Sequence, residues 1–294
     1  MKYDRIVNDN CVDFLSKHGK GDLRIDLSFL DPPFNQGKEY RAVDDNLPDE
    51  EYWKFMKKVC KLIYNRTADG GSIYFMQRDK NTKKVMETLE ETGWKFQNLI
   101  IWKKKTAAVP QGYRFGLSYQ VIVFAVKGNR PSVFNKLRIN PPRLITEKYE
   151  RPTGMYLTDV WDDIRELTSG YFAGDEAIRT ETGERFHKQQ SPIALLLRII
   201  LSSTKPGDLV FDPFSGTGTT LVVAKQLKRK YLGTELDPLN YDEIVKRLGE
   251  NREADSVNKY YKDYIYTENL DEIFPNKNQK ILNNSIFLSD NKDK

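Results

Sequence analysis

The sequence is poor in the residues that build disulfide-bonded or metal-bound scaffolds, and it lacks long apolar runs. Only two cysteines occur, Cys11 and Cys60, too few for a disulfide framework, and each lies in an apolar pattern typical of a core thiol. The two histidines, His18 and His187, belong to no Cys/His cluster with metal-ligand spacing. No apolar run approaches the roughly 20 residues that span a membrane. We therefore expect neither a metal site nor a membrane segment.

The chain also begins without the apolar stretch of a secretory signal, so the cytoplasm is the expected location. Its composition is that of a globular protein, with 39% hydrophobic and 30% charged residues among 294. The net charge of +5 suits a polyanionic partner but does not establish one. Seven Lys and Arg residues lie between Lys127 and Arg151, and this segment fits either a nucleic-acid contact or an ordinary solvated loop.

Apolar residues follow strand and helix periods in turn through the first part of the chain. Strands are predicted at residues 25–30, 72–76, 97–102 and 120–126, and helices at residues 48–64 and 81–91. The pair Gly70-Gly71 is expected to separate the first helical region from the next strand. Strands that alternate with helices predict a mostly parallel sheet covered on both faces.

The alternation fades between Gly128 and Phe186, where prolines and glycines interrupt it. It then returns, with helices predicted at 191–204, 217–227 and 241–248 and strands at 209–212 and 231–235. We expect residues 1–127 and 187–275 to be two halves of one α/β domain. Residues 128–186 would be an inserted module with little regular structure, and residues 276–294 a polar tail.

A glycine motif, FDPFSGTGTT at residues 211–220, stands between a predicted strand and a predicted helix. Glycines let the backbone approach a ligand, and the helix N-terminus supplies free N–H groups. Glu235 follows Gly216 by 19 residues, at the end of the next strand, where an α/β nucleotide site places an acid for the ribose hydroxyls. The alternative is a tight strand–helix turn that binds no ligand.

The details of this motif discriminate between cofactors. A dinucleotide fingerprint would have a third glycine where this chain has Leu221, and a phosphate-binding P-loop would have a lysine that is absent here. A nucleoside without phosphates therefore fits better, and S-adenosylmethionine is such a molecule.

A second motif, Asp31-Pro32-Pro33-Phe34, stands at the carboxyl end of predicted strand 25–30, where open α/β sheets bind ligands. An exocyclic amino group is a poor nucleophile because its lone pair is delocalised into the ring. Two acceptors, the carboxylate of Asp31 and the carbonyl of Pro32, would favour a pyramidal nitrogen and stabilise its developing charge. The prolines would hold both acceptors in place, and Phe34 would offer a flat face to an extruded base. A proline-rich strand end without a ligand becomes a poor alternative once the glycine motif occurs in the same chain.

Asp-Pro-Pro-Phe with a later Asp-Pro-Phe-x-Gly-x-Gly-Thr-Thr resembles the β class of DNA amino-methyltransferases, over roughly Arg5 to Leu248. In that class the catalytic motif precedes the cofactor motif, with target recognition between them. Further matches are NLIIWK at 98–103, VIVF at 121–124 and DVW at 159–161. The resemblance implies a Rossmann-like α/β fold with a seven-stranded, mostly parallel, circularly permuted sheet that has one antiparallel strand. It also implies S-adenosylmethionine as cofactor and direct methyl transfer to a flipped base of double-stranded DNA.

Two stretches depart from the pattern of this class. HKQQSP at residues 187–192 resembles the class's His-Pro-Thr-x-Lys-Pro, but Lys188 replaces the first proline and Ser191 replaces the lysine that usually contacts the cofactor. Near the N-terminus, alignment on Cys11 places Asn10 where the class has an Asp near the cofactor's adenine. The amide oxygen of Asn10 can accept from an adenine amino group as a carboxylate does.

The residues expected to act fall into three groups. The catalytic group is Asp31, Pro32, Pro33 and Phe34. The cofactor-binding group is Asn10, Asp31, Asp212, Phe214, Ser215, Gly216, Thr217, Gly218, Thr219, Glu235 and Asp237. DNA contacts are expected at Lys104, Arg114, Arg130, Arg138 and Arg143, within the 128–186 insertion and the 103–115 loop.

N6 of adenine is the favoured target because resembling families more often have Asp at position 31 for adenine and Ser for N4 of cytosine. N4-cytosine methylation remains the nearest alternative, ahead of RNA methylation and of an inactive DNA-binding or cofactor-sensing module. Methylation of cytosine C5 would need a nucleophilic cysteine, usually after a proline, and no proline precedes either cysteine. The sequence leaves open whether a cognate restriction endonuclease or a second copy of the chain is a partner.

Overall fold

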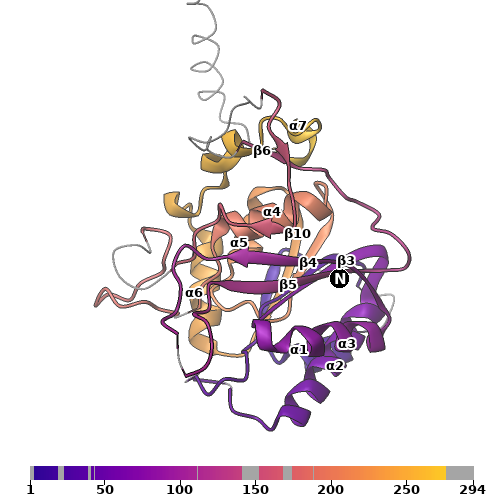
Figure 1. Ribbon diagram of the computed structural model, residues 1–294, viewed down its shortest axis with the longest axis vertical. Coiled ribbons are helices and arrows are strands. Elements are labelled where there is room, and N and C mark those ends of the chain that lie inside the picture. The colour runs from indigo at the N-terminus through magenta and orange to yellow at the C-terminus, as the bar shows by residue number, and fades with distance from the viewer. Residues whose placement is uncertain are drawn as a thin grey trace, which may run out of the picture.

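The computed structural model describes residues 3–18, 23–38, 41–42, 44–110, 112–140, 152–167, 174–187 and 189–275. Its central feature is one large sheet (Figure 1). The strands of this sheet, in chain order, are β1 (Arg5–Asn8), β2 (Ile25–Leu30), β3 (Thr67–Gln77), β4 (Trp94–Lys103), β5 (Tyr119–Lys127), β8 (Val160–Trp161), β9 (Leu209–Asp212) and β10 (Lys230–Glu235). In space their order is β1-β10-β9-β2-β3-β5-β4-β8.

Strand β5 is antiparallel to both of its neighbours, β3 and β4, and the other neighbouring strands are parallel. The mostly parallel, Rossmann-like sheet with one antiparallel strand is therefore confirmed. The expected seven strands are joined by an eighth, β8, which pairs with the edge of β4 through Val160 and Ile101. This strand comes from the range expected to be an irregular insertion.

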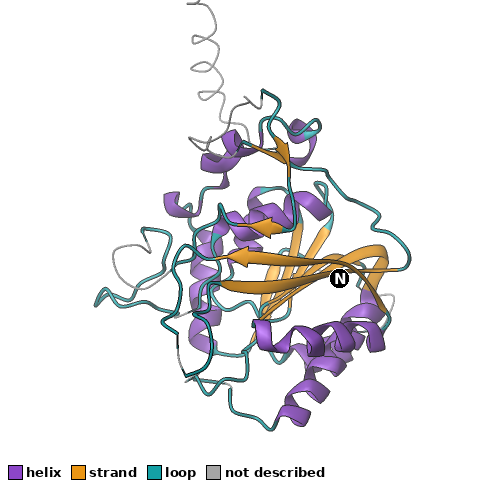
Figure 2. Ribbon diagram, viewed as in Figure 1, coloured by secondary structure: helices purple, strands orange, loops and turns teal. Residues whose placement is uncertain are grey.

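Helices cover both faces of the sheet, as Figure 2 shows. One face carries α1 (Cys11–Lys17), α2 (Asp49–Arg66) and α3 (Thr82–Thr92), and the other carries α4 (Ile193–Ser203), α5 (Thr219–Gln226) and α6 (Pro238–Gly249). Side chains alternate between the two layers along β3, where Ile73 and Phe75 face α1–α3 while Tyr74 and Met76 face α4. Burial on both sides explains why these strands are continuous apolar runs in the sequence.

Three further helical segments follow α6 in the described part of the chain: η3 (Glu253–Asp255), η4 (Val257–Tyr264) and α7 (Leu270–Ile273). Among the residues described, no helix is both long and apolar enough to cross a membrane. Within those same ranges, no group of three or more His, Cys, Asp and Glu residues is arranged to hold a metal ion.

The predicted boundary at Gly70-Gly71 was wrong. Helix α2 ends at Arg66 and β3 begins at once, so both glycines lie inside the strand. They occupy an irregularity, because Ile25 pairs with Thr67 whereas the next paired residue of β2 pairs with Ser72. Gly70 has a φ of +77°, and a Cβ on Gly71 would lie 2.5 Å from a side-chain carbon of Thr67. The glycines thus permit a bulge and do not end the element.

The range expected to be an insertion is anchored to the rest of the molecule. Its described residues form β8 and a two-stranded sheet of β6 (Arg138–Ile139) and β7 (Met155–Tyr156), each strand two residues long, and no helix. Leu137, Trp161 and Ile164 nevertheless belong to the main hydrophobic core. The 128–186 boundary remains a prediction, and the 276–294 tail lies outside the described residues.

Candidate active site at the carboxyl edge of the sheet

Four neighbouring parallel strands end in polar residues at one edge of the sheet. In spatial order, β1 is followed by Asn10, β10 ends at Glu235, β9 ends at Asp212, and β2 is followed by Asp31. After β2 the chain moves to β3 on one side, and after β9 it moves to β10 on the other. The edge between β2 and β9 is therefore a topological switch point, the place where open α/β sheets bind ligands. The two motifs found in the sequence meet there.

The glycine motif forms the turn between β9 and α5. Gly216 and Gly218 have φ values of +54° and +77°, in a backbone region that residues other than glycine rarely adopt. A Cβ on Gly218 would also lie 2.8 Å from Ile244 of α6, so this glycine allows the turn to pack closely against that helix. Gly218 is the N-cap of α5 and makes no side-chain cap, so the first N–H groups of the helix face the turn.

Glu235 joins the ends of β9 and β10. Its Oε2 accepts the backbone N–H of Gly216 at 2.8 Å, and its Oε1 accepts the N–H of Asp237 at 3.0 Å. Burial raises the pKa of Glu235, and these hydrogen bonds oppose that shift. The carboxylate therefore shapes the glycine turn itself, and its remaining lone pairs are what a ligand could use.

Asp237 is the N-cap of α6, with its Oδ1 accepting the N–H of Leu239 at 2.9 Å. Its Oδ2 accepts from Nε of Arg41 at 2.7 Å, and the Arg41 guanidinium lies 5.5 Å from the ring centre of Phe186. Arg41 was not identified from the sequence, where no spacing connects it to the second half of the chain. Both carboxylate oxygens of Asp237 therefore make structural hydrogen bonds within the protein.

Asp31 and Asp212 are the carboxylates at the switch point, and both line one small cavity. Burial raises the pKa of each to about 7. The charge of Asp212 raises the pKa of Asp31 further, while a hydrogen bond from Ser191 and the positive charge of Lys104 oppose the rise. Oγ of Ser191 donates to Oδ2 of Asp31 at 3.0 Å. A cation bound in this cavity would lower both pKa values.

The proline motif after β2 is fixed by its neighbours. The hydroxyl of Tyr52 donates to the carbonyl of Pro33 at 2.8 Å and accepts from Nε2 of Gln77 at 2.9 Å. Phe34 is only 3% exposed. Its ring, expected to offer a face to an extruded base, is therefore covered in this state, and stacking needs a movement of the ring or of the loop beyond it.

The loop beyond Phe34 is organised by Asp45, which the sequence did not single out. The buried carboxylate of Asp45 accepts backbone N–H groups of Asn35, Gln36 and Lys38 at 2.7, 3.2 and 3.0 Å. Asn35 itself has a φ of +52°. The side chain of Asn35 also donates to the carbonyl of Leu47 and accepts its N–H, each at 2.8 Å, so two side chains hold the described parts of this loop.

Asn10 lies beside the end of β10 but already has a structural role. It is the N-cap of α1, and its Oδ1 accepts the N–H of Val12 at 2.8 Å. Cys11, the next residue, is buried, and burial raises the pKa of its thiol to about 12. Cys60 is also buried and its pKa is raised as well. Neither cysteine has the character of a nucleophile.

The predicted DNA contacts separate into two locations. Lys104 directly follows β4 and Arg114 is exposed in the β4–β5 loop, so both lie at the same edge of the sheet as Asp31. Lys104 is half-buried, with its Nζ 5.4 Å from the ring centre of Trp102. Burial lowers the pKa of Lys104, and Glu166 and Asp31 oppose this shift. Its charge therefore acts on both Glu166 and Asp31, and a DNA contact at Lys104 stays a prediction.

Of the other predicted arginines, Arg130 and Arg138 lie in other parts of the structure. Arg130 follows β5, which runs antiparallel, and Ser132 beside it donates to the carbonyl of Gly70 near the start of β3. Arg130 thus lies at the opposite edge of the sheet. Arg138 of β6 donates to Thr153 and Gly154, and its hairpin contacts η4. Arg143 lies outside the described residues.

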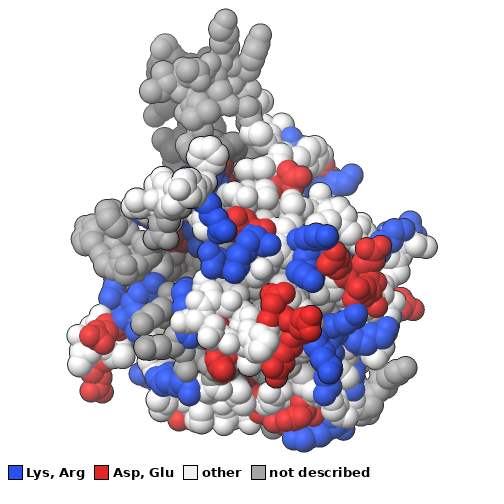
Figure 3. Space-filling model, turned by 60° about the horizontal axis from the view of Figure 1, so that its bottom comes forward, with Lys and Arg blue, Asp and Glu red and all other residues white. Residues whose placement is uncertain are grey.

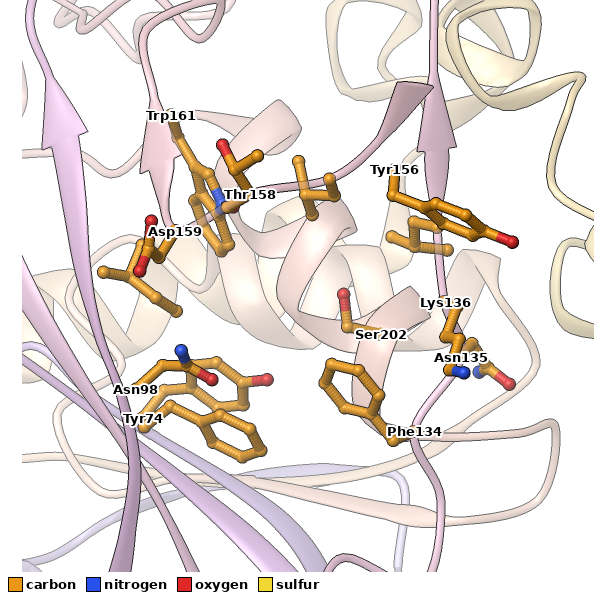
Figure 4. Close-up of a pocket in the computed structure, with 14 residues that line it drawn as sticks. Tyr74, Asn98, Phe134, Asn135, Lys136, Tyr156, Thr158, Asp159, Trp161 and Ser202 are labelled. Atoms are coloured by element: carbon orange, nitrogen blue, oxygen red, sulfur yellow. The ribbon is translucent and has the colours of Figure 1, made fainter. Parts of the chain in front are cut away.

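A larger cavity of about 400 Å³ lies over the face of β3, β5 and β4, and no predicted site residue lines it, although the guanidinium of Arg138 lies 4.3 Å from the ring centre of Tyr156 in its wall. Figure 4 shows aromatic side chains on both sides of it, with Tyr74 and Phe134 below and Tyr156 and Trp161 above. The polar groups of Asn135 and Ser202 within it donate to main-chain carbonyls. The cavity at the switch point, not this one, brings the two sequence motifs together.

Comparison with known proteins identifies the family to which the chain belongs. A family model described as DNA methylase, for N6 and N4 methyltransferases, matches residues 25–246. The type II methyltransferase M.HinfI of Haemophilus influenzae is 32% identical over 277 residues, which cover 83% of this chain and 71% of that protein. The range matched by the family model, residues 25–246, includes both motifs.

Solved structures show the same fold. The M1.HpyAVI–SAM complex has a TM-score of 0.58 at 22% identity, covering 84% of this chain and 99% of the other. The PvuII DNA methyltransferase, described as cytosine-N4-specific, has a TM-score of 0.62 at 18% identity, covering 92% and 94%. The chain therefore belongs to the family of S-adenosylmethionine-dependent N6/N4 amino-methyltransferases that modify DNA.

Proposed function

We propose that this protein transfers a methyl group from S-adenosylmethionine to N6 of adenine in double-stranded DNA. The observation that carries the proposal is the meeting of Asp31 and the glycine turn at one switch point. Asp at position 31, where Ser is more frequent in N4-cytosine enzymes, supports adenine. N4 of cytosine is the second candidate target, because the fold is also similar to that of the PvuII enzyme, which is described as cytosine-N4-specific.

The residues at the switch point fit this cofactor. The turn at Gly216 leaves open space, since a Cβ there would meet only His187 and a carbonyl at 3.9 Å or more, so a ligand can approach the backbone. Glu235 would hold the ribose hydroxyls, and the half-buried carboxylate of Asp31 with the buried carboxylate of Asp212 suits a cation. When bound, the cofactor supplies an electrophilic methyl group on a positively charged sulfur. The other predicted cofactor residues, Asn10 and Asp237 included, would frame this site.

The protein's own part in the reaction is to hold the target amine. The carboxylate of Asp31 accepts one N–H and the carbonyl of Pro32 accepts the other, which favours a nucleophilic lone pair on nitrogen. Tyr52 holds the neighbouring Pro33 carbonyl and so fixes the direction of the turn. A carboxylate with a pKa raised toward 7 can also take the proton that the methylated nitrogen loses.

DNA would bind across the carboxyl edge of the sheet, with the target base flipped toward Asp31. Supporting this side are Arg114 and its exposed neighbours Tyr113 and Phe115, which are 108% and 96% exposed. Sequence recognition would come from the 128–186 range together with this loop. M.HinfI is named a type II methyltransferase, and we extend the proposal to a cognate restriction endonuclease. The proposal also includes a homodimer, which a measurement of the oligomeric state in solution would test.

The deciding experiment incubates the protein with duplex DNA and labelled cofactor, then digests the DNA to nucleosides for mass spectrometry. N6-methyladenine is the expected product, and N4-methylcytosine alone would refute the choice of base while leaving the family intact. Asp31→Ala should lower the methylation rate on the order of 10²-fold or more, because a preorganised acceptor is lost. Activity of this variant within a few-fold of wild type would remove Asp31 from the mechanism.

A further inference from the structure

Ser191 is the residue that touches the carboxylate of Asp31 most directly, although 160 positions separate them in the chain. Its hydroxyl donates to Oδ2 at 3.0 Å, and both side chains line the cavity at the switch point. A carboxylate can rotate about its last single bond, so its two oxygens exchange places unless one of them is held. Ser191 holds one oxygen, and no described residue donates a hydrogen bond to Oδ1, so that oxygen can face a substrate.

The segment that carries Ser191 is clamped on both sides. The side chain of Gln190 accepts the N–H of Ile178 through Oε1 and donates to the carbonyl of Glu176 through Nε2, each at 2.9 Å. On the other side, Oε1 of Glu176 accepts the N–H of Ile193 at 2.5 Å. Glu176 thus caps the first turn of α4, which begins at Ile193. Two residues in the 128–186 range therefore fix the position of Ser191.

The rigidity of the next residue adds to this clamp. Pro192 is the N-cap of α4, with a φ of −72°, and its ring removes one backbone rotation directly after Ser191. Gln190 is buried, and so is the whole first turn of α4 apart from the half-buried Ala194. Pro192, the capped start of α4 and the side chain of Gln190 together fix the backbone at Ser191. The hydroxyl of Ser191 therefore points in one direction.

The charged groups around Asp31 cannot give this orientation. Asp212, from the neighbouring strand, opposes ionisation of Asp31, while Lys104 and Lys38 favour it through their charge. Tyr52, from α2, also lies near and hydrogen-bonds Pro33 and Gln77. Point charges stabilise the carboxylate without selecting which oxygen faces the substrate, whereas a hydrogen bond selects one.

We propose that Ser191 is a positioning residue for methyl transfer, which orients the carboxylate of Asp31 so that its second oxygen accepts the target amine. The proposal rests on the function proposed above for Asp31. It also assigns Glu176 and Gln190 the task of keeping Ser191 in place, so that the 128–186 range and the catalytic carboxylate are mechanically connected.

The test compares Ser191→Ala with Ser191→Thr, which keeps the hydroxyl, in single-turnover methylation at saturating DNA and cofactor between pH 5.5 and 9. Asp31 must be ionised to accept the amine, so the rate falls as pH drops through its pKa. Loss of the Ser191 donor destabilises the ionised form, so in Ser191→Ala this acidic limb should move upward by about one pH unit. The rate at pH 7 should fall about tenfold, and Ser191→Thr should recover both properties.

Ser202→Ala is the matched control, because Ser202 is a buried serine near the end of α4, the helix that begins just after Ser191, and its hydroxyl donates to the backbone carbonyl of Arg198. Its pH profile should coincide with that of wild type. A wild-type rate and acidic limb in Ser191→Ala would overturn the positioning role, and so would an unshifted limb with weakened cofactor binding. An active Asp31→Ala enzyme would instead overturn the proposed function, so the two failures are distinguishable.

Discussion

At the scale of single residues, the site contains ionisable groups that burial makes costly to ionise. Asp31 and Asp212 are neighbours at the ends of adjacent strands, and both have pKa values raised to about 7. Such arrangements are typical of functional sites, because stability alone would favour neutral side chains there. The free-energy cost of ionising these carboxyl groups depends on pH.

Asp31→Asn is expected to stabilise the protein, and more so at high pH. The folded-state pKa of Asp31 is about 7 and its ordinary value 3.8, so the ionisation cost is absent below pH 3.8, grows between these values and is complete above 7. Urea unfolding should show the variant gaining on the order of 2 kcal/mol or more over wild type at pH 8.5, and less at pH 5. The exposed Asp242→Asn provides the control. An equal gain at both pH values would contradict the raised pKa.

Glu235→Ala is expected to weaken S-adenosylmethionine binding by tenfold or more, about the value of one hydrogen bond to a charged group. The carboxylate would be lost both to the ligand and to the N–H of Gly216, so the glycine turn would loosen as well. Calorimetric titration gives the dissociation constant. Glu243→Ala, on the adjacent helix α6, should leave it unchanged. If Glu235→Ala bound cofactor as wild type does, the ribose would have to be held elsewhere.

At the scale of elements, strand direction decides which loops reach the site. The loop between β4 and β5 returns to the carboxyl edge because β4 ends there, whereas the loop after β5 emerges at the far edge. With about 3.4 Å per residue, the nine residues of β5 separate the two edges by roughly 30 Å. Two exposed arginines, Arg114 and Arg130, therefore occupy opposite edges of the sheet.

Arg114→Ala should weaken binding to every DNA duplex and reduce the slope of binding against salt concentration by about 1, if Arg114 contacts a phosphate. Loss of one position of sequence preference would instead identify a base contact. Arg130→Ala is the matched control and should leave both properties unchanged. Fluorescence anisotropy across a salt series measures them. Equal effects of the two substitutions would contradict the proposed DNA-binding edge.

At the scale of the whole molecule, charge and packing show how the parts are held together. Figure 3 shows that basic and acidic side chains are interspersed on the face of the molecule that carries α1–α3. The net charge of +5 is therefore not concentrated in one basic patch on that face. The 128–186 range is tied to the core by an ion pair between Asp163 and Arg198 of α4, with the Arg198 side chain 3% exposed. Burial acts to raise the pKa of Asp163, but the hydrogen bond and charge of Arg198 contribute to a net lowering.

Asp163→Ala should destabilise the whole protein by about 3 kcal/mol, because it leaves a buried guanidinium without its partner. Denaturant unfolding followed by circular dichroism measures the loss. Glu91→Ala, which removes a half-exposed surface pair with Lys57, should cost less than about 1 kcal/mol. If Asp163→Ala cost no more than this control, the insertion would be only loosely attached to the core.

Much of this molecule is determined by local sequence. Alternating apolar periods located most strands and helices of both halves to within a few residues, because each element has to bury an apolar face. They did not identify β1 and α1, for which no strand or helix was predicted. The glycine turn, Glu235 and the Asp31 motif were also evident, since each depends on residue types at short spacing. The strand ends that carry them meet because adjacent parallel strands place their carboxyl ends at one edge.

Other features depend on which strands are neighbours, and only the tertiary structure decided them. Arg130 looked equivalent to Arg114 in the sequence, but the antiparallel direction of β5 carries it to the far edge. Gly70 looked like a boundary, whereas a bulge between β2 and β3 places it inside a strand. Ser191 stood only as a departure from a family pattern until the fold placed it beside Asp31. In each case a residue's role depends on a contact between distant parts of the chain, which local periodicity and spacing do not encode.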